Sequence, residues 1–199
     1  MKQLTPFLKR DYWQYIYGAV DRGPVTVGTE EYYDDIFNAC NNCPNPLIVE
    51  CGAGGTTYLF FHIVCCNDGY LISCDTDPQW MVSQFMLSPR YQFMNIDCIK
   101  LDVQSILNHY GKDKIDILYM DAGTDYQINL DWFNIYDKFL EPGSKLICHD
   151  TGYTENGIAK SVMDYTNITF DIHYPENITS THWHLEHRPG FGLTICEKL

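Results

Sequence analysis

The sequence lacks an apolar run of the length that a transmembrane helix requires. A span needs about 20 consecutive apolar residues, and no apolar stretch of this 199-residue chain reaches that length. The opening letters MKQLTPFLKRDYWQ also contain no apolar core of a secretory signal. We therefore expect a cytoplasmic protein that does not act at a membrane.

Basic residues are scarce. The chain has 13 lysines and arginines against 26 aspartates and glutamates, which gives a formal net charge of −13 at pH 7. A surface of this charge repels phosphate backbones and anionic lipids. We therefore expect no nucleic-acid partner.

The nine cysteines lack the pattern of a disulfide framework or a zinc site. Their number is odd, and most lie in apolar segments such as HIVCCN and LICHD, where reduced, buried thiols are expected. Cys40 and Cys43 have the spacing of a zinc-binding pair, but no second pair at matching spacing follows them. Structural zinc at this pair stays a minor alternative.

What the chain does contain is an alternation of short apolar runs with segments of helical length. Its length suits one domain, with residues 1–44 as an N-terminal helical segment of the same domain as residues 45–199. We expect strands near residues 46–51, 70–75, 98–103, 115–122, 144–150, 168–174 and 192–198. We expect helices near residues 56–66, 78–93, 103–110, 129–140 and 157–165, with at least one more before residue 40.

These strands predict the fold class. Runs that are apolar on both sides of the pleat belong to strands covered on both faces, and helices between them make the sheet parallel. The last two runs are joined by the polar, aromatic loop THWHLEHRPGF and no helix, so the last strand is expected to be antiparallel. The prediction is a doubly wound α/β sheet of seven strands, with ligands at the carboxyl ends of the strands.

The stretch LIVECGAGGTTYLFF, residues 47–61, places glycines between a strand and a helix. Glycine lets a ligand approach the backbone, and the amides of the next helix attract negative charge. A dinucleotide fingerprint would need a third glycine where Thr57 stands, and no Gly-Lys-Ser or Gly-Lys-Thr follows as in a phosphate loop. Glu50, two residues before Gly52, would repel a pyrophosphate but attract a sulfonium group, which favours S-adenosylmethionine.

Acidic residues end two further predicted strands. Asp75 follows the second strand, where a carboxylate can accept both hydroxyls of a ribose, and Asp102 follows the third, within reach of an adenine amino group. A solvated turn or a helix cap is the commoner role for any single aspartate. Three acids at the ends of three successive strands, Glu50 included, weaken that simpler explanation.

Taken in order, VECGAGG, SCDTD, KLDVQSIL and IDILYMDAG…LEPGSKLICHDTGY resemble the motifs of class I S-adenosylmethionine-dependent methyltransferases. The resemblance covers residues 45–199 and implies a Rossmann-like fold with a reversed last strand. It also implies the residues that contact the cofactor: Glu50, Gly52, Gly54 and Thr57 near the amino acid part, Asp75 at the ribose, Asp102 at the adenine, and Asp121.

A second cluster follows the fourth and fifth predicted strands: Asp121, His149 and Asp150. Carboxylates and an imidazole beside a cofactor can bind Mg²⁺ or Mn²⁺. The pattern resembles the small metal-dependent O-methyltransferases of the catechol type and of the antibiotic and sugar type, which implies that these three residues hold the ion. Catechol-type members carry a lysine three residues after the first aspartate, where this chain has Thr124. His149 is therefore left as either a metal ligand or a catalytic base.

We expect an S-adenosylmethionine-dependent enzyme that methylates a hydroxyl of a small molecule or sugar with the help of a divalent metal. The alternatives are a metal-free small-molecule or protein methyltransferase, and a catalytically silent nucleotide-binding module of the same fold. Thr124 favours the silent module, whereas Asp75, Asp102 and Asp121 oppose it. The sequence leaves open the acceptor, self-association into a homo-oligomer, and the role of the histidine-rich segment 181–188.

Overall fold

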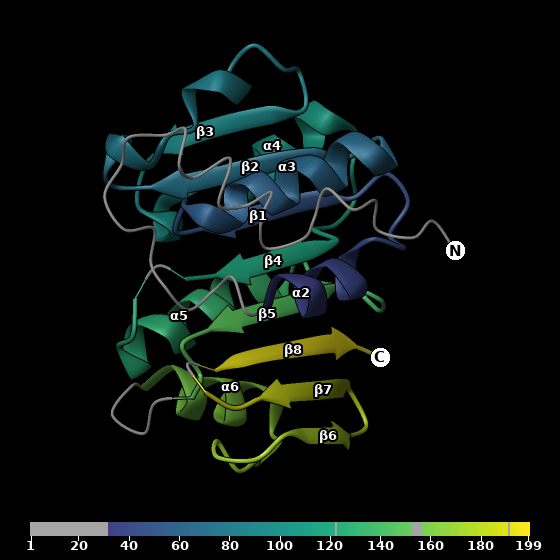
Figure 1. Cartoon of the computed structure of the whole chain (residues 1–199), viewed down its shortest axis with the longest axis vertical. Coiled ribbons are helices and arrows are strands. Elements are labelled where there is room, and N and C mark those ends of the chain that lie inside the picture. The colour runs from purple at the N-terminus through teal and green to yellow at the C-terminus, as the bar shows by residue number, and fades with distance from the viewer. Residues whose placement is uncertain (1–31, 122, 153–156, 191) are drawn as a thin grey trace.

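The computed structural model describes residues 32–121, 123–152, 157–190 and 192–199, and the structural statements below refer to these residues. They form three layers, with α2 and α3 on one face of a sheet and α4, α5 and α6 on the other (Figure 1). Of the expected N-terminal helical segment 1–44, residues 1–31 lie outside the described residues, and the helix Tyr33–Cys40 lies within them.

Helices and strands alternate along most of the chain. The α-helices are α2 (Tyr33–Cys40), α3 (Gly55–Asn67), α4 (Val103–Tyr110), α5 (Tyr126–Asp137) and α6 (Gly157–Thr166), and the short 3-10 helices are η3 (Pro78–Trp80), η4 (Ser83–Phe85) and η5 (Cys98–Lys100). The strands are β1 (Leu47–Cys51), β2 (Tyr70–Asp75), β3 (Tyr91–Asn95), β4 (Ile117–Met120), β5 (Lys145–His149), β6 (Glu176–Thr179), β7 (Trp183–Arg188) and β8 (Leu193–Lys198).

The sheet has the order β3-β2-β1-β4-β5-β8-β7-β6. Strands β1 to β5 are parallel, and β8 is inserted antiparallel between β5 and β7. The expected Rossmann-like, mostly parallel α/β fold with a reversed last strand is thereby confirmed, although the sheet has eight strands where seven were predicted. The strand order reverses between β1 and β4, and ligands of such sheets bind at the carboxyl edge beside this point.

The predicted third strand is wrong. Residues 98–103 form η5 and the start of α4, because Asp97 and Asp102 accept hydrogen bonds from amides two and three residues ahead and so begin helical turns. The true third strand is β3, which begins at Tyr91, near the end of the segment 78–93 that was expected to be a helix. Since β3 is an edge strand and only half-buried, YQFMN lacks the apolar run of a central strand.

The predicted sixth strand, at residues 168–174, is wrong as well. The chain instead forms the antiparallel pair β6 and β7. Within the supposed loop, Trp183, Leu185 and His187 are buried at every second position, which is the alternation of a strand with one covered face. We missed β7 because one of its buried positions is a histidine.

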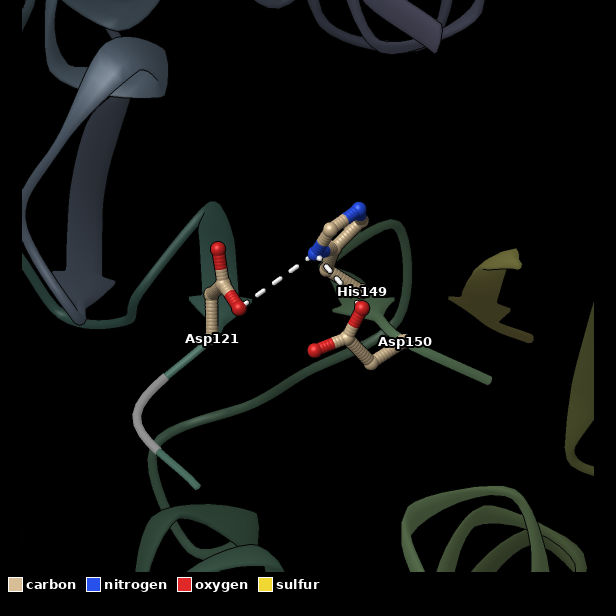
Figure 2. Close-up of side chains that lie close together, drawn as sticks. All are labelled: Asp121, His149 and Asp150. Carbon is tan, nitrogen blue, oxygen red and sulfur yellow. Dashed lines mark hydrogen bonds and ion pairs between the residues drawn. The ribbon is translucent and has the colours of Figure 1, made fainter. Parts of the chain in front are cut away.

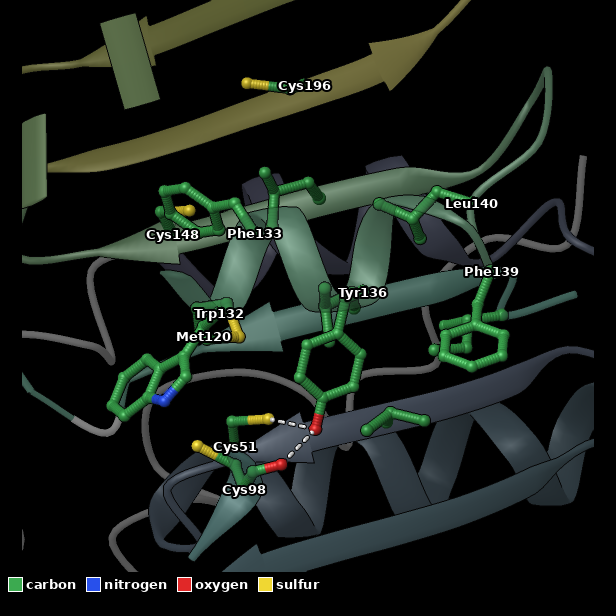
Figure 3. Packing of buried hydrophobic residues seen from close by; sticks show 14 of the residues in the cluster. Cys51, Cys98, Met120, Trp132, Phe133, Tyr136, Phe139, Leu140, Cys148 and Cys196 are labelled. Carbon is green, nitrogen blue, oxygen red and sulfur yellow. Dashed lines mark hydrogen bonds between the residues drawn. The ribbon is translucent and has the colours of Figure 1, made fainter. Parts of the chain in front are cut away.

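Two hydrophobic clusters fill the space on either side of the sheet. Leu47 and Val49 of β1 belong to the cluster under α4, α5 and α6, whereas Ile48 between them belongs to the cluster under α2 and α3. In the first cluster, Tyr136 of α5 reaches the sheet and donates a hydrogen bond to the Cys98 carbonyl at 2.8 Å (Figure 3). Both faces of the central strands are therefore covered, as the apolar runs predicted.

None of the nine cysteines forms a disulfide, and six of them are buried. Within the described ranges, neither Cys40 nor Cys43 belongs to a group of three or more side chains that could hold a metal ion. Among the residues described, no helix has the length and apolar character needed to span a membrane.

Candidate active site

The glycine turn connects β1 to α3 at the carboxyl edge of the sheet. Gly52 has a φ of +93°, which side-chain-bearing residues rarely adopt, and its amide donates to the Cys74 carbonyl at 2.9 Å. Gly54 is extended, and a Cβ added to it would meet no atom within 4 Å. The turn therefore has open space beside its backbone, as close approach of a cofactor requires.

Glu50 lies beneath this turn with no exposed surface. Its carboxylate accepts hydrogen bonds from the hydroxyls of Thr56 at 2.6 Å, Thr57 at 2.7 Å and Ser73. Thr57 also accepts the amide of Gly54 at 3.0 Å, which closes the first turn of α3. Removal from water raises the pKa of Glu50 to about 7, even though the three hydroxyl donors act to lower it. Glu50 thus braces the turn from below, and its direct contact with the cofactor stays a prediction.

Of the other predicted cofactor acids, Asp75 lies at the carboxyl end of β2, and its ribose role stays a prediction. It ends β2, is half-buried, and accepts the amides of Ala53 at 3.1 Å and Asp77 at 2.8 Å. Asp102 is exposed and caps α4 by accepting the Ser105 amide at 3.1 Å. Because β3 ends at Asn95, the acid nearest that strand end is Asp97, which the sequence analysis did not select. The adenine role of Asp102 stays a prediction.

The structure brings Asp121, His149 and Asp150 together at the carboxyl ends of β4 and β5 (Figure 2). The His149 Nδ1 atom lies 3.3 Å from Asp121 Oδ1 and 3.4 Å from Asp150 Oδ1. The imidazole is 8% exposed, and each carboxylate is 31% exposed. The amide of Asp121 donates to the Cys51 carbonyl at 2.8 Å, so the cluster begins one strand away from the glycine turn.

The local conformation of the cluster is unusual for side-chain-bearing residues. Asp150 has a φ of +59°, in the left-handed region that is uncommon outside glycine. Burial raises the pKa of its carboxyl, as does nearby Asp121, whereas His149 lowers it. Strained backbone and crowded carboxylates are typical of functional sites.

The three side chains fit a hard divalent cation. One ligand atom from each lies within 4.8 Å of the others, and ligands on opposite sides of an ion at 2.0–2.6 Å would be about 4–5 Å apart. Two carboxylates and one imidazole are a donor set that Mg²⁺ or Mn²⁺ accepts. The same contacts also suit a histidine that a carboxylate orients as a base.

Thr124, which stands in place of the catechol-type lysine, lies in the loop between β4 and α5. Its carbonyl accepts the Gly157 amide at 2.9 Å, and the next residue, Asp125, caps α5 by accepting the Ile128 amide. This segment therefore joins α5 to the start of α6 and supplies no ammonium group of its own.

A buried chain of three polar side chains, which the sequence analysis also missed, ends at the residue that follows Asp150. The His187 Nδ1 atom and Thr194 Oγ1 are 2.9 Å apart, and Thr194 Oγ1 donates to Thr151 Oγ1 at 2.8 Å. All three residues have no exposed surface, and Thr151 directly follows Asp150. Burial lowers the pKa of His187, which favours its neutral form. The only sequence signal for this chain was the alternation of β7.

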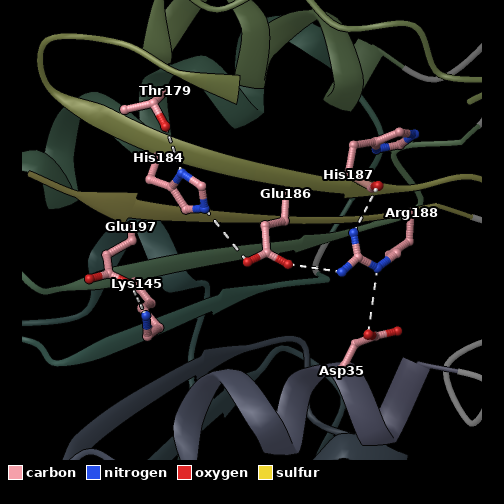
Figure 4. Close-up of polar contacts among 8 residues, drawn as sticks. All are labelled: Asp35, Lys145, Thr179, His184, Glu186, His187, Arg188 and Glu197. Carbon is pink, nitrogen blue, oxygen red and sulfur yellow. Dashed lines mark hydrogen bonds and ion pairs between the residues drawn. The ribbon is translucent and has the colours of Figure 1, made fainter. Parts of the chain in front are cut away.

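The face of β5, β7 and β8 that points toward α2 carries charged residues that pair with one another (Figure 4). Arg188 contacts Glu186 at 2.8 Å and Asp35 of α2 at 3.5 Å, and Lys145 contacts Glu197. These side chains line a cleft of about 560 Å³ between α2 and the sheet. Lys145 starts β5, whereas His149 of the cluster ends it, so the cleft extends to the opposite edge of the sheet. We therefore do not assign the methyl acceptor to this cleft.

The chain matches the sequence model of a protein family, and its fold is similar to that of several solved structures. The model of a methyltransferase domain matches residues 49–151. Similar solved structures include a SAH-bound methyltransferase of Podospora anserina (TM-score 0.63, 10% identity, 98% of this chain and 89% of that one). CalS11, a TDP-rhamnose 3'-O-methyltransferase of calicheamicin biosynthesis, follows with TM-score 0.56, 13% identity, and 96% and 81% coverage.

MycE, from the mycinamycin pathway and in complex with Mg, SAH and mycinamycin VI, has TM-score 0.60 and 16% identity. It is a longer protein, because the alignment covers 98% of this chain but 55% of MycE. At these identities the structures show the fold alone. A comparison with curated protein sequences gave no match.

The strand order, the reversed β8 and the glycine turn define the class I methyltransferase fold. The domain model covers about half of the chain, and the protein belongs to this methyltransferase family. It is an S-adenosylmethionine-dependent methyltransferase with a fold similar to that of small O-methyltransferases.

Proposed function

We propose that the protein methylates a hydroxyl of a small molecule or sugar, with a divalent cation held by Asp121, His149 and Asp150. The observation that carries this proposal is the position of the cluster. It lies at the carboxyl ends of β4 and β5, and the Asp121 amide is bonded to the last residue of β1, directly before the glycine turn. A cation and a cofactor bound at these two places would be neighbours.

The residues of the chain have separate tasks in this proposal. The turn at Gly52 and Gly54 receives the amino acid part of the cofactor, and Asp75 receives its ribose. A bound divalent ion polarises a hydroxyl oxygen and lowers its pKa. Asp121 and Asp150 hold the acceptor side of the site at a fixed distance from the cofactor, and alignment of reacting atoms contributes several kcal/mol to catalysis.

The proposal of a small acceptor rests on charge and on comparison. A net charge of −13 disfavours nucleic acid as the substrate. CalS11 is a TDP-rhamnose 3'-O-methyltransferase, and the MycE structure is a complex with Mg, SAH and mycinamycin VI. The shared fold makes these chemistries reasonable models for this chain without fixing the acceptor.

A metal-free reaction is the second candidate, and one contact favours it. The His149 Nδ1 atom lies between two carboxylates, and an imidazole so held is oriented for proton transfer. In that case His149 would take the hydroxyl proton itself, as a general base.

Release of SAH over a panel of catechols, sugar nucleotides and glycosides separates the two candidates. We expect EDTA to abolish turnover and added Mg²⁺ or Mn²⁺ to restore it, and His149→Ala to lower the rate by about 10²-fold or more. Asp150→Asn should have a similar effect, whereas Asp113→Asn, a change of an exposed acid outside the site, should have none.

Turnover that survives EDTA while His149→Ala is inactive would favour the metal-free reaction. Full activity of both cluster variants would contradict any role of this cluster in the chemistry.

A further inference from the structure

Three polar side chains form a row across the middle of the sheet. Glu50 of β1 is the direct register partner of Ser73 on β2 and of Tyr119 on β4. All three lie on the face covered by α3 and have no exposed surface. Two residues earlier on the same face, each strand carries an apolar side chain, namely Ile48, Leu71 and Ile117. The row is therefore a polar interruption of an otherwise apolar core.

Tyr119 connects this row to the cluster. The Thr56 hydroxyl donates to Glu50 at 2.6 Å, and the Tyr119 hydroxyl donates to Asp121 Oδ2 at 3.2 Å. The other oxygen of that carboxylate, Oδ1, faces His149. Tyr119 is thus the register partner of the acid beneath the cofactor turn and is bonded to the cluster at the ends of β4 and β5.

Tyr119 is rigid in this arrangement. Its ring packs edge-on against Phe60 of α3, with centroids 5.2 Å apart and an interplanar angle of 63°. With the ring fixed, the hydroxyl contacts only one of the two oxygens of Asp121. This bond leaves the second oxygen directed at His149, which is the orientation that a shared cation needs.

We propose that the Tyr119 hydroxyl is a positioning group for Asp121, and that packing of the ring against Phe60 keeps this hydroxyl in place. This inference deepens the proposed function and rests on it, because it concerns the cation that Asp121, His149 and Asp150 would share. It assigns a role to Tyr119 that a buried tyrosine of a strand core would not otherwise have.

The test is a Mn²⁺ titration of the full chain followed by electron paramagnetic resonance, with turnover not used as the readout. Tyr119→Phe removes one oxygen atom and keeps the ring against Phe60. We expect Mn²⁺ affinity to fall by about 10–100-fold, the usual effect of losing a partner of a metal ligand. SAH affinity, measured by calorimetry, should be unchanged.

Tyr136→Phe is the matched control, because Tyr136 is equally buried and its hydroxyl also bonds a partner, the Cys98 carbonyl, but on the other face of the sheet. It should leave Mn²⁺ affinity unchanged. Phe60→Leu is a second variant, which keeps Tyr119 and its hydroxyl but removes the ring that fixes it. It should weaken Mn²⁺ binding, by less than Tyr119→Phe does.

The outcomes separate the two proposals. If the wild type binds Mn²⁺ and both Tyr119→Phe and Phe60→Leu bind it equally well, the positioning role is wrong and the proposed metal site stands. If the wild type binds no Mn²⁺, the metal-dependent function fails and the positioning role fails with it. Should Tyr119→Phe not fold, the comparison of Phe60→Leu with the wild type decides alone.

Discussion

Glu50 braces the glycine turn, but the burial of its carboxylate has a cost in free energy. A carboxylate without exposed surface is expensive unless donors surround it, and here three hydroxyls do so. The remaining cost is visible as a pKa raised to about 7. This residue therefore makes stability depend on pH in a direction opposite to that of a salt-bridged acid.

We expect Glu50→Gln to remove this dependence. Unfolded glutamate titrates near 4.5 and native Glu50 near 7, so the native state holds the extra proton between these values. The free energy of unfolding of the wild type should therefore fall as pH rises through this interval, and level off above it. The loss is on the order of 3 kcal/mol at most. Urea unfolding at pH 5 and pH 8 measures it as the difference between wild type and variant.

Glu141→Gln changes an exposed glutamate and should keep the pH dependence of the wild type. A Glu50→Gln variant that loses as much stability between pH 5 and pH 8 as the wild type would show that Glu50 does not carry the effect.

At the scale of elements, the start of β8 fixes the loop that carries Asp150. Gly192 has a φ of +93°, and a Cβ added there would lie 1.7 Å from the amide nitrogen of Gly152. The Thr151 amide also donates to the Gly192 carbonyl at 3.3 Å. The close contact between this glycine and the loop is possible only without a side chain.

Gly192→Ala should therefore destabilise the protein by roughly 2–5 kcal/mol, since left-handed strain and overpacking add. Gly111→Ala is the matched control. Gly111 also has a positive φ, of +62°, but a Cβ there meets no atom within 4 Å, so only the strain of about 1–2 kcal/mol applies. Urea unfolding compares the two. Equal losses would show that the loop moves away without cost.

The elements that the sequence predicted well are those with strong local signals. The helix over 103–110 begins at the cap Asp102 and ends before Gly111, which has a left-handed conformation. The central strands β1, β2, β4 and β5 were found because both of their faces are buried. The missed strands, β3, β6 and β7, have one polar face or lie at an edge, and their patterns resemble those of a helix or a loop.

At the scale of the whole molecule, cofactor binding at the glycine turn should raise the stability of the native state. A ligand that binds only the native state raises the melting temperature. S-adenosylmethionine or SAH at 100 times its dissociation constant should stabilise the protein by about 2.7 kcal/mol. For a chain of this length that corresponds to an increase of about 5–11 °C.

NAD is the control for this thermal-shift measurement. The turn has Thr57 where a dinucleotide fingerprint has its third glycine, and Glu50 lies beneath it, so NAD should produce no shift. Absence of a shift with both S-adenosylmethionine and SAH would instead favour the catalytically silent module of the same fold.

The sequence by itself determined the fold class, the glycine turn, and the acids at the ends of the central strands, because these depend on local patterns of burial and backbone conformation. It also named Asp121, His149 and Asp150 in advance. Only the tertiary structure decided which side chains support them. Tyr119 meets Glu50 through strand register, and His187 meets Thr151 through β8. Such contacts join residues 69 and 36 positions apart, and the period of a strand tells which face a residue occupies but not which neighbour lies beside it.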